Sequence, residues 1–450
     1  MTQTVALPLW LFGLIIAFAA LSFASNFLLP SVRWFFRARA ERAVARLNQR
    51  LDRPIDLFKL AERQDRIARL IYDPHVMEAV ADYAAETGQP VPVVFEQARH
   101  FAREIVPGFS ATLYFGVAIR LARTLSRTLY RVRFGKPDDA LSGIDPQAAL
   151  VFVINHRSNM DYVLVTWLVA RRASLSYAVG EWARVWPLSG MIRAMGAYFI
   201  RRNSGNVLYR RVLARYVQMT TAEGITQAIF PEGGLSVNGR TGAARLGLLS
   251  YIMAGPAGGR DVVFVPVGLA YDRVLEDRVL IQAATDGTRR FRMQPLAVLA
   301  GTLRVMLRLL LRRFKGFGTA AASFGQPVSL RAFLADHPLA TTEALGQHLM
   351  AAIEAVVPVV PVPLVAAALR QGPRDFAGLL AQVQALQQAL LQRGAVLKLA
   401  PQGDAATVQE GLDVLQGRHL IGPDYRPLQG AQAVLDFYAA SVLQRLEAPA

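Results

Sequence analysis

Cysteine is absent from the 450 residues of the chain. A disulfide framework and a cysteine-ligated metal or iron–sulfur centre are therefore excluded. The six histidines are scattered and form no cluster with ligand spacing, so the sequence predicts no metal and no bound cofactor.

Acidic side chains are scarce as well: 33 Asp and Glu stand against 50 Lys and Arg, for a net charge of +17. Apolar residues make up 53% of the chain, charged residues only 18%, and the mean hydropathy is +0.27. A chain this apolar and basic is expected to bind anionic membrane lipids or acidic ligands. Nucleic acid is not expected, because no zinc-finger spacing, recognition-helix pattern or aromatic–basic RNA motif is present.

Charge is missing altogether from Met1 to Val32, and Val5 to Leu29 is long and apolar enough to span a bilayer core. Arginines follow from Arg33 onward, which by the positive-inside rule predicts a transmembrane anchor over residues 1–32 with the body of the chain on the cytoplasmic side of the inner (plasma) membrane. A cleaved signal peptide is the alternative. An uncleaved anchor is favoured because no Lys or Arg precedes the apolar run.

A second run lacks acidic residues, from Gly287 to Ala335, where nine basic residues occur. Within it, Thr302 to Phe314 spaces arginines four apart among Leu, Val and Met. Such a segment is typical of a helix lying in the membrane interface. A core-facing helix with a solvated arginine edge fits equally well.

The remaining chain divides into three predicted regions. Residues 33–135 carry helical periodicity, including Asp65 to Tyr83 and Phe109 to Val132, and residues 336–450 are Ala-, Leu- and Gln-rich and mostly helical. Between them, residues 136–335 alternate short apolar runs with helical ones, which predicts an α/β domain with a mostly parallel sheet. The expected strands are 150–154, 175–179, 198–200, 227–230, 262–269 and 319–324.

The most informative of these strands ends at His156. Asp161 follows five residues later, and open α/β sheets place their chemistry at the carboxyl ends of strands. A histidine held by a carboxylate can remove a proton from a hydroxyl near neutral pH. The alternative is a helix-capping box, Ser158-x-x-Asp161, in which the acid does no chemistry.

Three further strand ends carry polar residues. Gly196 to Arg202 ends in the paired guanidinium groups of Arg201 and Arg202, which suit phosphate. Gln227 to Phe230 leads into Glu232, Gly233 and Gly234, with Arg240 and Arg245 further along. The strand Val263 to Leu269 leads into Tyr271-Asp272, and its Pro266 suits an edge strand or a bulge better than a regular central position.

Taken in order, these four motifs resemble the glycerolipid acyltransferases, in the glycerol-3-phosphate and dihydroxyacetone-phosphate acyltransferase branch. The matching segments are His156–Asp161, Gly196–Arg202, Phe230–Arg240 and Val265–Asp272, with a fainter match at Pro361–Leu369. The resemblance implies that residues 136–335 form an acyltransferase catalytic domain. It also implies transfer of a fatty acyl chain from acyl-CoA or acyl-carrier protein to glycerol-3-phosphate, with no covalent acyl-enzyme.

The resemblance also implies roles for individual residues. His156 is expected to act as general base and Asp161 to orient its ring. The expected substrate-binding residues are Arg193, Arg201, Arg202, Glu232, Gly233, Gly234, Arg240 and Arg245.

One departure concerns the acceptor. The family has Arg-Ser-Arg-Thr-Gly-Arg after Glu-Gly-Gly, whereas this chain has Leu235-Ser-Val-Asn-Gly-Arg240, so two of the three arginines are replaced by Leu235 and Val237. Lysophosphatidate is therefore an alternative acceptor. Two other functions stay open: a thioesterase using the same His and Asp, and a non-catalytic scaffold on the membrane surface.

Overall fold

The computed structural model describes residues 8–447 apart from 24–41, 43, 46–47, 50, 52, 54, 56, 136–140, 171–172, 181–187, 202–203, 256–258, 288–306, 308–310, 312–313, 315 and 373–374. The chain forms two units, residues 1–54 and 55–450. In the first unit α1 (Leu9–Phe23) is uncharged. Among the described helices, none is both long and apolar enough to cross a membrane. The rest of the expected anchor, and most of Thr302 to Phe314, lie outside the described residues.

The second unit is built on one sheet whose order is β1-β7-β6-β2-β5-β3-β4, with β8 paired to β6. Strands β6, β2, β5, β3 and β4 are parallel, and β7 and β8 run antiparallel to β6, so the predicted mostly parallel sheet is confirmed. The strands are β1 (Arg131–Phe134), β2 (Ala149–Ile154), β3 (Ser176–Val179), β4 (Tyr198–Phe199), β5 (Gln227–Ile229), β6 (Val262–Tyr271), β7 (Thr319–Phe324) and β8 (Val328–Ser329).

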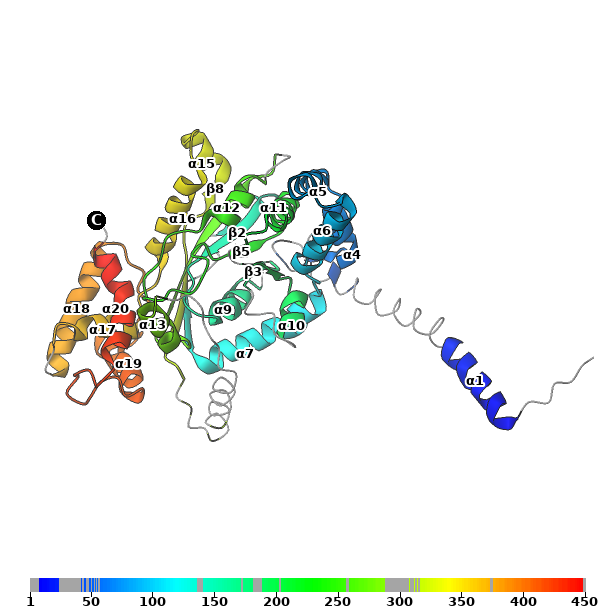
Figure 1. Ribbon diagram of the computed structural model, residues 1–450. Helices are drawn as coiled ribbons and strands as arrows, with labels where there is room; N and C mark the ends of the chain where they lie inside the picture. The colour runs from blue at the N-terminus through cyan, green and yellow to red at the C-terminus, as the bar shows by residue number, and fades with distance from the viewer. Residues whose placement is uncertain are drawn as a thin grey trace, which may run out of the picture. The chain divides into compact units, whose positions relative to one another are not determined.

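Helices cover both faces of the sheet, as Figure 1 shows. In β2, Leu150, Phe152 and Ile154 belong to one hydrophobic core, while Val151 and Val153 belong to the other. Burial on both faces explains the unbroken apolar run of this strand. The helices are α3 (Leu57–Leu60), α4 (Arg63–Ile71), α5 (Pro74–Thr87), α6 (Val91–Ile105), η2 (Thr112–Ala118, a π-helix), α7 (Ile119–Leu129), α9 (Met160–Val169), α10 (Leu188–Ala194), α11 (Val207–Ala222), α12 (Leu246–Met253), α13 (Asp277–Thr285), α15 (Leu330–Asp336), α16 (Thr342–Val356), α17 (Pro361–Leu369), α18 (Phe376–Gln392), α19 (Asp404–Gly417) and α20 (Gln432–Glu447).

Two of the expected helical segments differ from the structure. The segment from Asp65 to Tyr83 is interrupted between α4 and α5, because Pro74 starts a new helix and the Asp73 side chain accepts a hydrogen bond from the amide of His75 at 3.0 Å. The segment from Phe109 to Val132 ends in β1, whose Arg-Val-Arg-Phe sequence has little of the apolar character expected of a strand.

Pro266 lies in a central strand, β6, and not at an edge of the sheet. Its position explains why it is tolerated. Strand β7 pairs with β6 from Val267 onward and β8 pairs only with Val263 and Phe264, so Pro266 lies between the two ladders. The missing amide therefore interrupts no regular pairing on that side.

The C-terminal helices pack around α17, whose nine residues are all buried. In Figure 1, α18, α19 and α20 surround it at one end of the second unit. Asp272 at the end of β6 joins this region to the sheet. Its carboxylate accepts hydrogen bonds from the amides of Val362 at 2.7 Å and Thr319 at 2.5 Å. Burial raises the pKa of Asp272 to about 6.

Candidate active site

His156 lies just past the carboxyl end of β2, as expected. Asn155, between the strand and His156, fixes this end of β2 to β6: its side-chain amide donates to the carbonyl of Leu269 at 2.9 Å and accepts from the Leu269 amide at 2.7 Å. These two hydrogen bonds take the place of the next backbone pairing between β2 and β6, which ends at Ile154. The loop that carries His156 therefore leaves the sheet from a defined position.

The side chains of His156 and Asp161 are in contact and buried. Nδ1 of His156 lies 2.9 Å from Oδ2 of Asp161, and both residues are at most 1% exposed. The same Oδ2 accepts hydrogen bonds from the amides of Arg157 at 2.7 Å and Ser158 at 3.0 Å. Asp161 thus makes both contacts that the sequence presented as alternatives. It secures the turn before α9 and it holds the imidazole.

Aromatic rings fix the plane of the imidazole. Phe230 stacks on it with a centroid distance of 4.2 Å, and Tyr162 meets it edge-on at 5.5 Å. Within the part of the chain that the structure describes, no group hydrogen bonds to Nε2 of His156. The ring is therefore held through Nδ1 and by its contacts with the two aromatic rings.

Tyr271 reaches the same carboxylate from the end of β6. Its hydroxyl donates to Oδ1 of Asp161 at 2.7 Å. Burial, together with the negative charge of Asp161, raises the pKa of Tyr271 well above its ordinary value, so the phenol stays a donor. Each oxygen of Asp161 therefore has a buried partner. Tyr271 belonged to a strand-end motif of the sequence, but nothing in the sequence indicated that it binds Asp161.

Glu276, which was not predicted, holds the other side of the loop. It accepts hydrogen bonds from the hydroxyl of Ser158 at 2.8 Å, from the amide of Asn159 at 3.2 Å and from the side chain of Asn159 at 3.0 Å. Burial raises its pKa, and these three hydrogen bonds oppose the change. Because it lies 115 residues or more from its partners in sequence, no local spacing could have revealed it.

Glu232 lies beside His156 through the backbone. Its Oε1 accepts from the amide of His156 at 2.8 Å and its Oε2 from the amide of Gly242 at 3.0 Å. Burial raises the pKa of Glu232, and the nearby guanidinium of Arg157 opposes this. Glu232 therefore connects the His156 loop to the loop of residues 231–245, which we call the EGG loop.

Glycine is required at the turn of the EGG loop. Gly233 has φ +66°, and a Cβ there would lie 2.4 Å from Cδ of Arg245. Arg245 therefore covers the turn, and its own amide donates to the carbonyl of Pro231 at 2.7 Å. Gly234 continues the same turn.

The other predicted arginines are placed as follows. Arg201 binds Glu104 of α6 through two hydrogen bonds of 2.9 and 2.6 Å. Arg193 lies over the ring of Phe199 at 5.1 Å. Arg240 forms two hydrogen bonds, of 2.7 and 3.0 Å, with Glu447 of α20. Arg202 lies outside the described residues. In the described ranges, none of these arginines hydrogen bonds to His156 or Asp161.

Helix α20 holds the EGG loop from the outside. Gln444 accepts from the amide of Thr241 at 2.8 Å and donates to its carbonyl at 3.0 Å. Gly239 has φ +76°, and a Cβ there would lie 1.8 Å from the carbonyl oxygen of Phe437. The C-terminal helices thus contribute to the geometry of the loop that Glu232 joins to His156.

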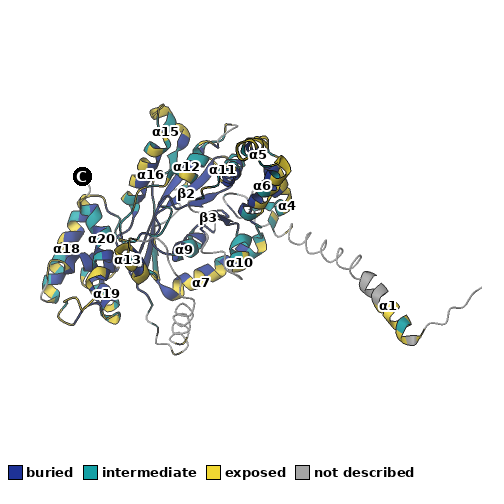
Figure 2. Ribbon diagram, in the orientation of Figure 1, coloured by how far each residue is buried: buried dark blue, intermediate teal, exposed yellow. Residues whose placement is uncertain are grey.

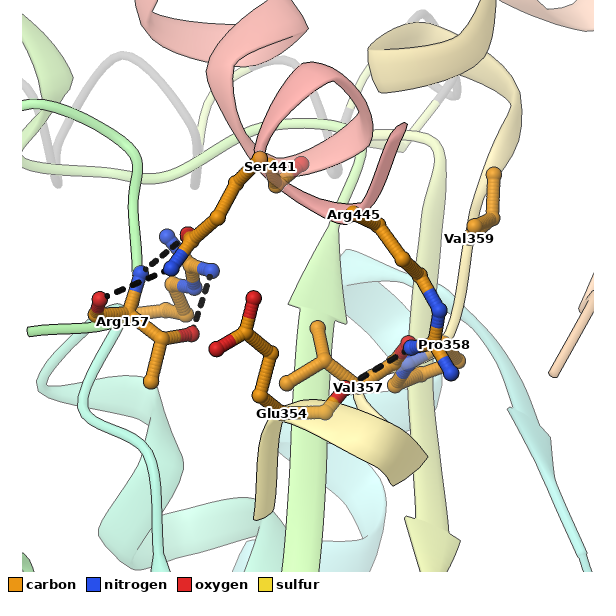
Figure 3. Close-up of a pocket in the computed structure, with 9 residues that line it drawn as sticks. Arg157, Glu354, Val357, Pro358, Val359, Ser441 and Arg445 are labelled. Carbon is orange, nitrogen blue, oxygen red and sulfur yellow. Dashed lines mark hydrogen bonds between the residues drawn. The ribbon is translucent and has the colours of Figure 1, made fainter. Parts of the chain in front are cut away.

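A small pocket opens where this loop meets α16 and α20, and its lining includes Arg157, Glu354 and Arg445 (Figure 3). Arg157, which was not predicted, donates to the carbonyl of Gly239 and to the hydroxyl of Thr241. Arg445 donates to the carbonyls of Glu354 and Val357 at the end of α16. Neither His156 nor Asp161 lines this pocket, and these two arginines hold backbone segments together there.

The chain is similar to known acyltransferases in two adjacent regions. Residues 136–270 match the family model described as Acyltransferase, and residues 301–442 match the Glycerol-3-phosphate acyltransferase C-terminal region. The glycerol-3-phosphate acyltransferase of Pseudomonas entomophila is 27% identical over 387 residues, which cover 81% of this chain and 45% of that protein. That of Aeromonas hydrophila is 28% identical over 300 residues, 64% of this chain and 35% of that protein.

The chain spans about half the length of the first of these relatives, 45%. Among solved structures, the 1-acyl-sn-glycerophosphate acyltransferase of Thermotoga maritima is 15% identical with a TM-score of 0.36, covering 65% of this chain and 94% of that one. The two family models follow one another along the chain as the resemblance of the four motifs implies. The resemblance to the glycerolipid acyltransferases, in the glycerol-3-phosphate acyltransferase branch, is thus confirmed over residues 136–270 and 301–442.

Proposed function

We propose that this protein transfers a fatty acyl chain from acyl-CoA or acyl-carrier protein to the hydroxyl of glycerol-3-phosphate. The observation that carries the proposal is the buried pair of His156 and Asp161, whose side chains lie 2.9 Å apart at the carboxyl end of β2. The similarity of the chain to glycerol-3-phosphate acyltransferases supports the substrate class.

In the proposed mechanism Nε2 of His156 accepts the proton of the acceptor hydroxyl while the hydroxyl oxygen attacks the thioester carbonyl. Asp161 keeps the proton on Nδ1 and stabilises the imidazolium that forms, the arrangement seen in serine hydrolases without the enzyme nucleophile. When the tetrahedral intermediate collapses, the carbon–sulfur bond breaks. The proton on Nε2 then passes to the leaving thiolate, so the histidine returns to its starting state.

The phosphate of the acceptor would be bound by arginines near the strand ends, with Arg201, Arg202 and Arg240 as candidates and Arg193 and Arg245 as further ones. Arg240 would have to exchange its partner Glu447 for the phosphate. Both contacts are exposed, so the exchange costs little. Glu232 acts in this proposal by positioning the EGG loop, because both of its oxygens already accept backbone amides.

Lysophosphatidate is the second candidate acceptor, and two residues favour it. Leu235 and Val237 stand where the family carries arginines, and both pack partly buried against the hydrophobic core. A site with fewer cations and more apolar surface suits an acceptor that already carries one acyl chain.

We also propose that the apolar segment Val5 to Leu29 anchors the protein in the inner membrane with the catalytic domain on the cytoplasmic side. The sequence supports this through the uncharged first 32 residues and the arginines that follow. Anionic membrane lipids would then be partners of the basic chain.

The experiment that tests this function offers glycerol-3-phosphate and lysophosphatidate separately to membranes holding the wild-type protein, with a long-chain acyl-CoA or acyl-carrier protein as donor. An ester from glycerol-3-phosphate that requires His156 supports the proposal. An ester from lysophosphatidate alone supports the second candidate. Free fatty acid without ester would indicate a thioesterase and contradict both.

A further inference from the structure

The outer side of η2 and α7 combines exposed apolar and basic residues. Val117, Leu121 and Leu125 are 53%, 54% and 36% exposed, and their spacing of four places them along one side of the helix. Arg120, Arg123 and Arg127 are also exposed and recur at spacings of three and four, which makes a second stripe. We call these six residues together the α7 outer face. Figure 2 shows exposed positions along this helix.

The buried side of the same helix is distinct from both stripes. Ala118, Ala122, Ser126 and Leu129 are buried, and α7 packs against α9. The valine and two leucine side chains of the outer face therefore do not pack in the hydrophobic core. Three exposed apolar side chains in a row, on a helix that already buries another side, indicate a surface for a partner.

The charge of this surface is of one sign. Residues 105–137 contain six Arg and Lys and no Asp or Glu. Arg131 and Arg133 pair with Glu410. Across the described ranges, Arg120 and Arg123 form no ion pair, and the guanidinium of Arg127 lies over the ring of Trp167, 5.4 Å from its centroid. Exposed guanidinium groups beside exposed leucines can bind a partner that presents both anionic groups and apolar chains.

Two aromatic side chains near the α7 outer face also suit a partner that presents anionic groups and apolar chains. Phe134 of β1 is 44% exposed and its ring meets that of Trp167 of α9 at 6.0 Å. Tryptophan and arginine side chains with an apolar body and a polar end are typical of the boundary between lipid headgroups and acyl chains.

We propose that the α7 outer face lies in the interface of a membrane that contains anionic lipid, with the leucines among the first acyl carbons and the arginines at the phosphates. This inference deepens the membrane location proposed above and rests on it, but it does not depend on acyl transfer. Because α7 packs on α9, which carries Asp161, the contact would place the reactive pair close to the layer in which acyl chains are dissolved.

The absence of cysteine allows a direct test with single labels. Leu121→Cys and, as matched control, Leu391→Cys on α18 (57% exposed) are each labelled with the environment-sensitive nitrobenzoxadiazole fluorophore. The full chain is reconstituted in vesicles of phosphatidylcholine alone or with phosphatidylglycerol. Lipids with a nitroxide on the acyl chain and aqueous iodide serve as the two quenchers.

The expected result is blue-shifted emission at position 121 that is quenched by the nitroxide and protected from iodide, more strongly with phosphatidylglycerol, while the label at 391 stays open to iodide. Replacing Arg120, Arg123 and Arg127 together by Gln should weaken the anionic-lipid dependence by about fivefold per arginine. Equal iodide quenching at both positions in both vesicles would overturn the proposal. So would protection at position 121 already present without vesicles, which would indicate a contact between protein chains.

The readout also separates this proposal from the catalytic one. The quenching pattern needs no substrate, so it can succeed if no ester is formed, and ester formation can be measured when the label shows no contact with lipid.

Discussion

Tyr271 donates a hydrogen bond to one oxygen of Asp161 at 2.7 Å, while His156 is bound to the other oxygen at 2.9 Å. The carboxylate is thus shared between a phenol at the end of β6 and an imidazole at the end of β2. The side chain of Asp161 therefore connects the carboxyl ends of two neighbouring parallel strands.

Removing the phenol should slow catalysis, because it loosens the carboxylate that holds the imidazole. In Tyr271→Phe, Asp161 loses the hydrogen bond on Oδ1 and keeps the contact of Oδ2 with His156. We expect kcat/KM at neutral pH to fall about 10- to 150-fold, since a hydrogen bond to a charged group contributes about 1.5–3 kcal/mol. Tyr251→Phe, a part-buried tyrosine on α12, is the control. An unchanged kcat/KM with normal thermal stability would contradict this role of Tyr271.

Glu276 should act as a positioning residue for the loop that carries His156. Glu276→Ala removes the acceptor of three hydrogen bonds from Ser158 and Asn159, and we expect kcat to fall by about 10- to 100-fold because the reactive geometry loosens. Glu276→Gln, which keeps one acceptor oxygen, should recover part of the activity.

The control for this pair is Asp286→Ala, an exposed carboxylate just after α13. It should leave kcat at the wild-type value. If Glu276→Ala kept full activity as well, the three hydrogen bonds would be structural only.

Gly239 should be intolerant of a side chain because α20 approaches it. Gly239→Ala brings a Cβ within 1.8 Å of the carbonyl oxygen of Phe437, whereas Gly430, with the same φ of +76°, has nothing within 4 Å. Gly430→Ala should therefore cost only the strain of the left-handed backbone, about 1–2 kcal/mol. Gly239→Ala should lower Tm further and reduce activity, because α20 must move from the EGG loop. Equal Tm values for the two variants would contradict this account.

Asp272 should make stability decrease as pH rises. Its pKa is raised to about 6 in the folded chain, so between about pH 4 and pH 6 the folded state keeps a proton that the unfolded state has lost. The free energy of unfolding should then fall by about 3 kcal/mol across this range through Asp272 alone. Asp272→Asn has no such titration. Urea unfolding of both proteins at pH 4, 5 and 6 should therefore give a difference that changes with pH, and a constant difference would refute the assignment.

Local patterns in the sequence were enough to predict six of the eight strands and the pairing of His156 with Asp161. An apolar run such as Ala149 to Ile154 predicts a buried strand without knowledge of the strands beside it. His156 and Asp161 are only five residues apart, so their pairing could also be predicted from local sequence. The residues that were missed act across long separations. Glu276 reaches Ser158 from 118 positions away, and Arg157 binds Gly239 across 82. Their partners are set by the order of the strands, which the sequence alone did not specify.

The strand β1 was missed for a different reason. Its arginines Arg131 and Arg133 are paired with Glu410 of α19, so a strand that looks too polar to be part of the sheet is stabilised by a helix almost 280 residues later. Pro266 was misjudged in the same way, because the gap between β7 and β8 that accommodates it exists only in the assembled sheet.

The central claim is that His156 is the general base of an acyl transfer, and the most direct measurement compares ester formation from glycerol-3-phosphate by the wild-type protein, His156→Ala and His100→Ala in the same membranes. His100 is exposed on α6 and serves as the matched control. We predict that His156→Ala loses about 10²- to 10⁴-fold in kcat while His100→Ala does not change and all three proteins show the same Tm. Near-wild-type turnover by a folded His156→Ala protein would contradict the account.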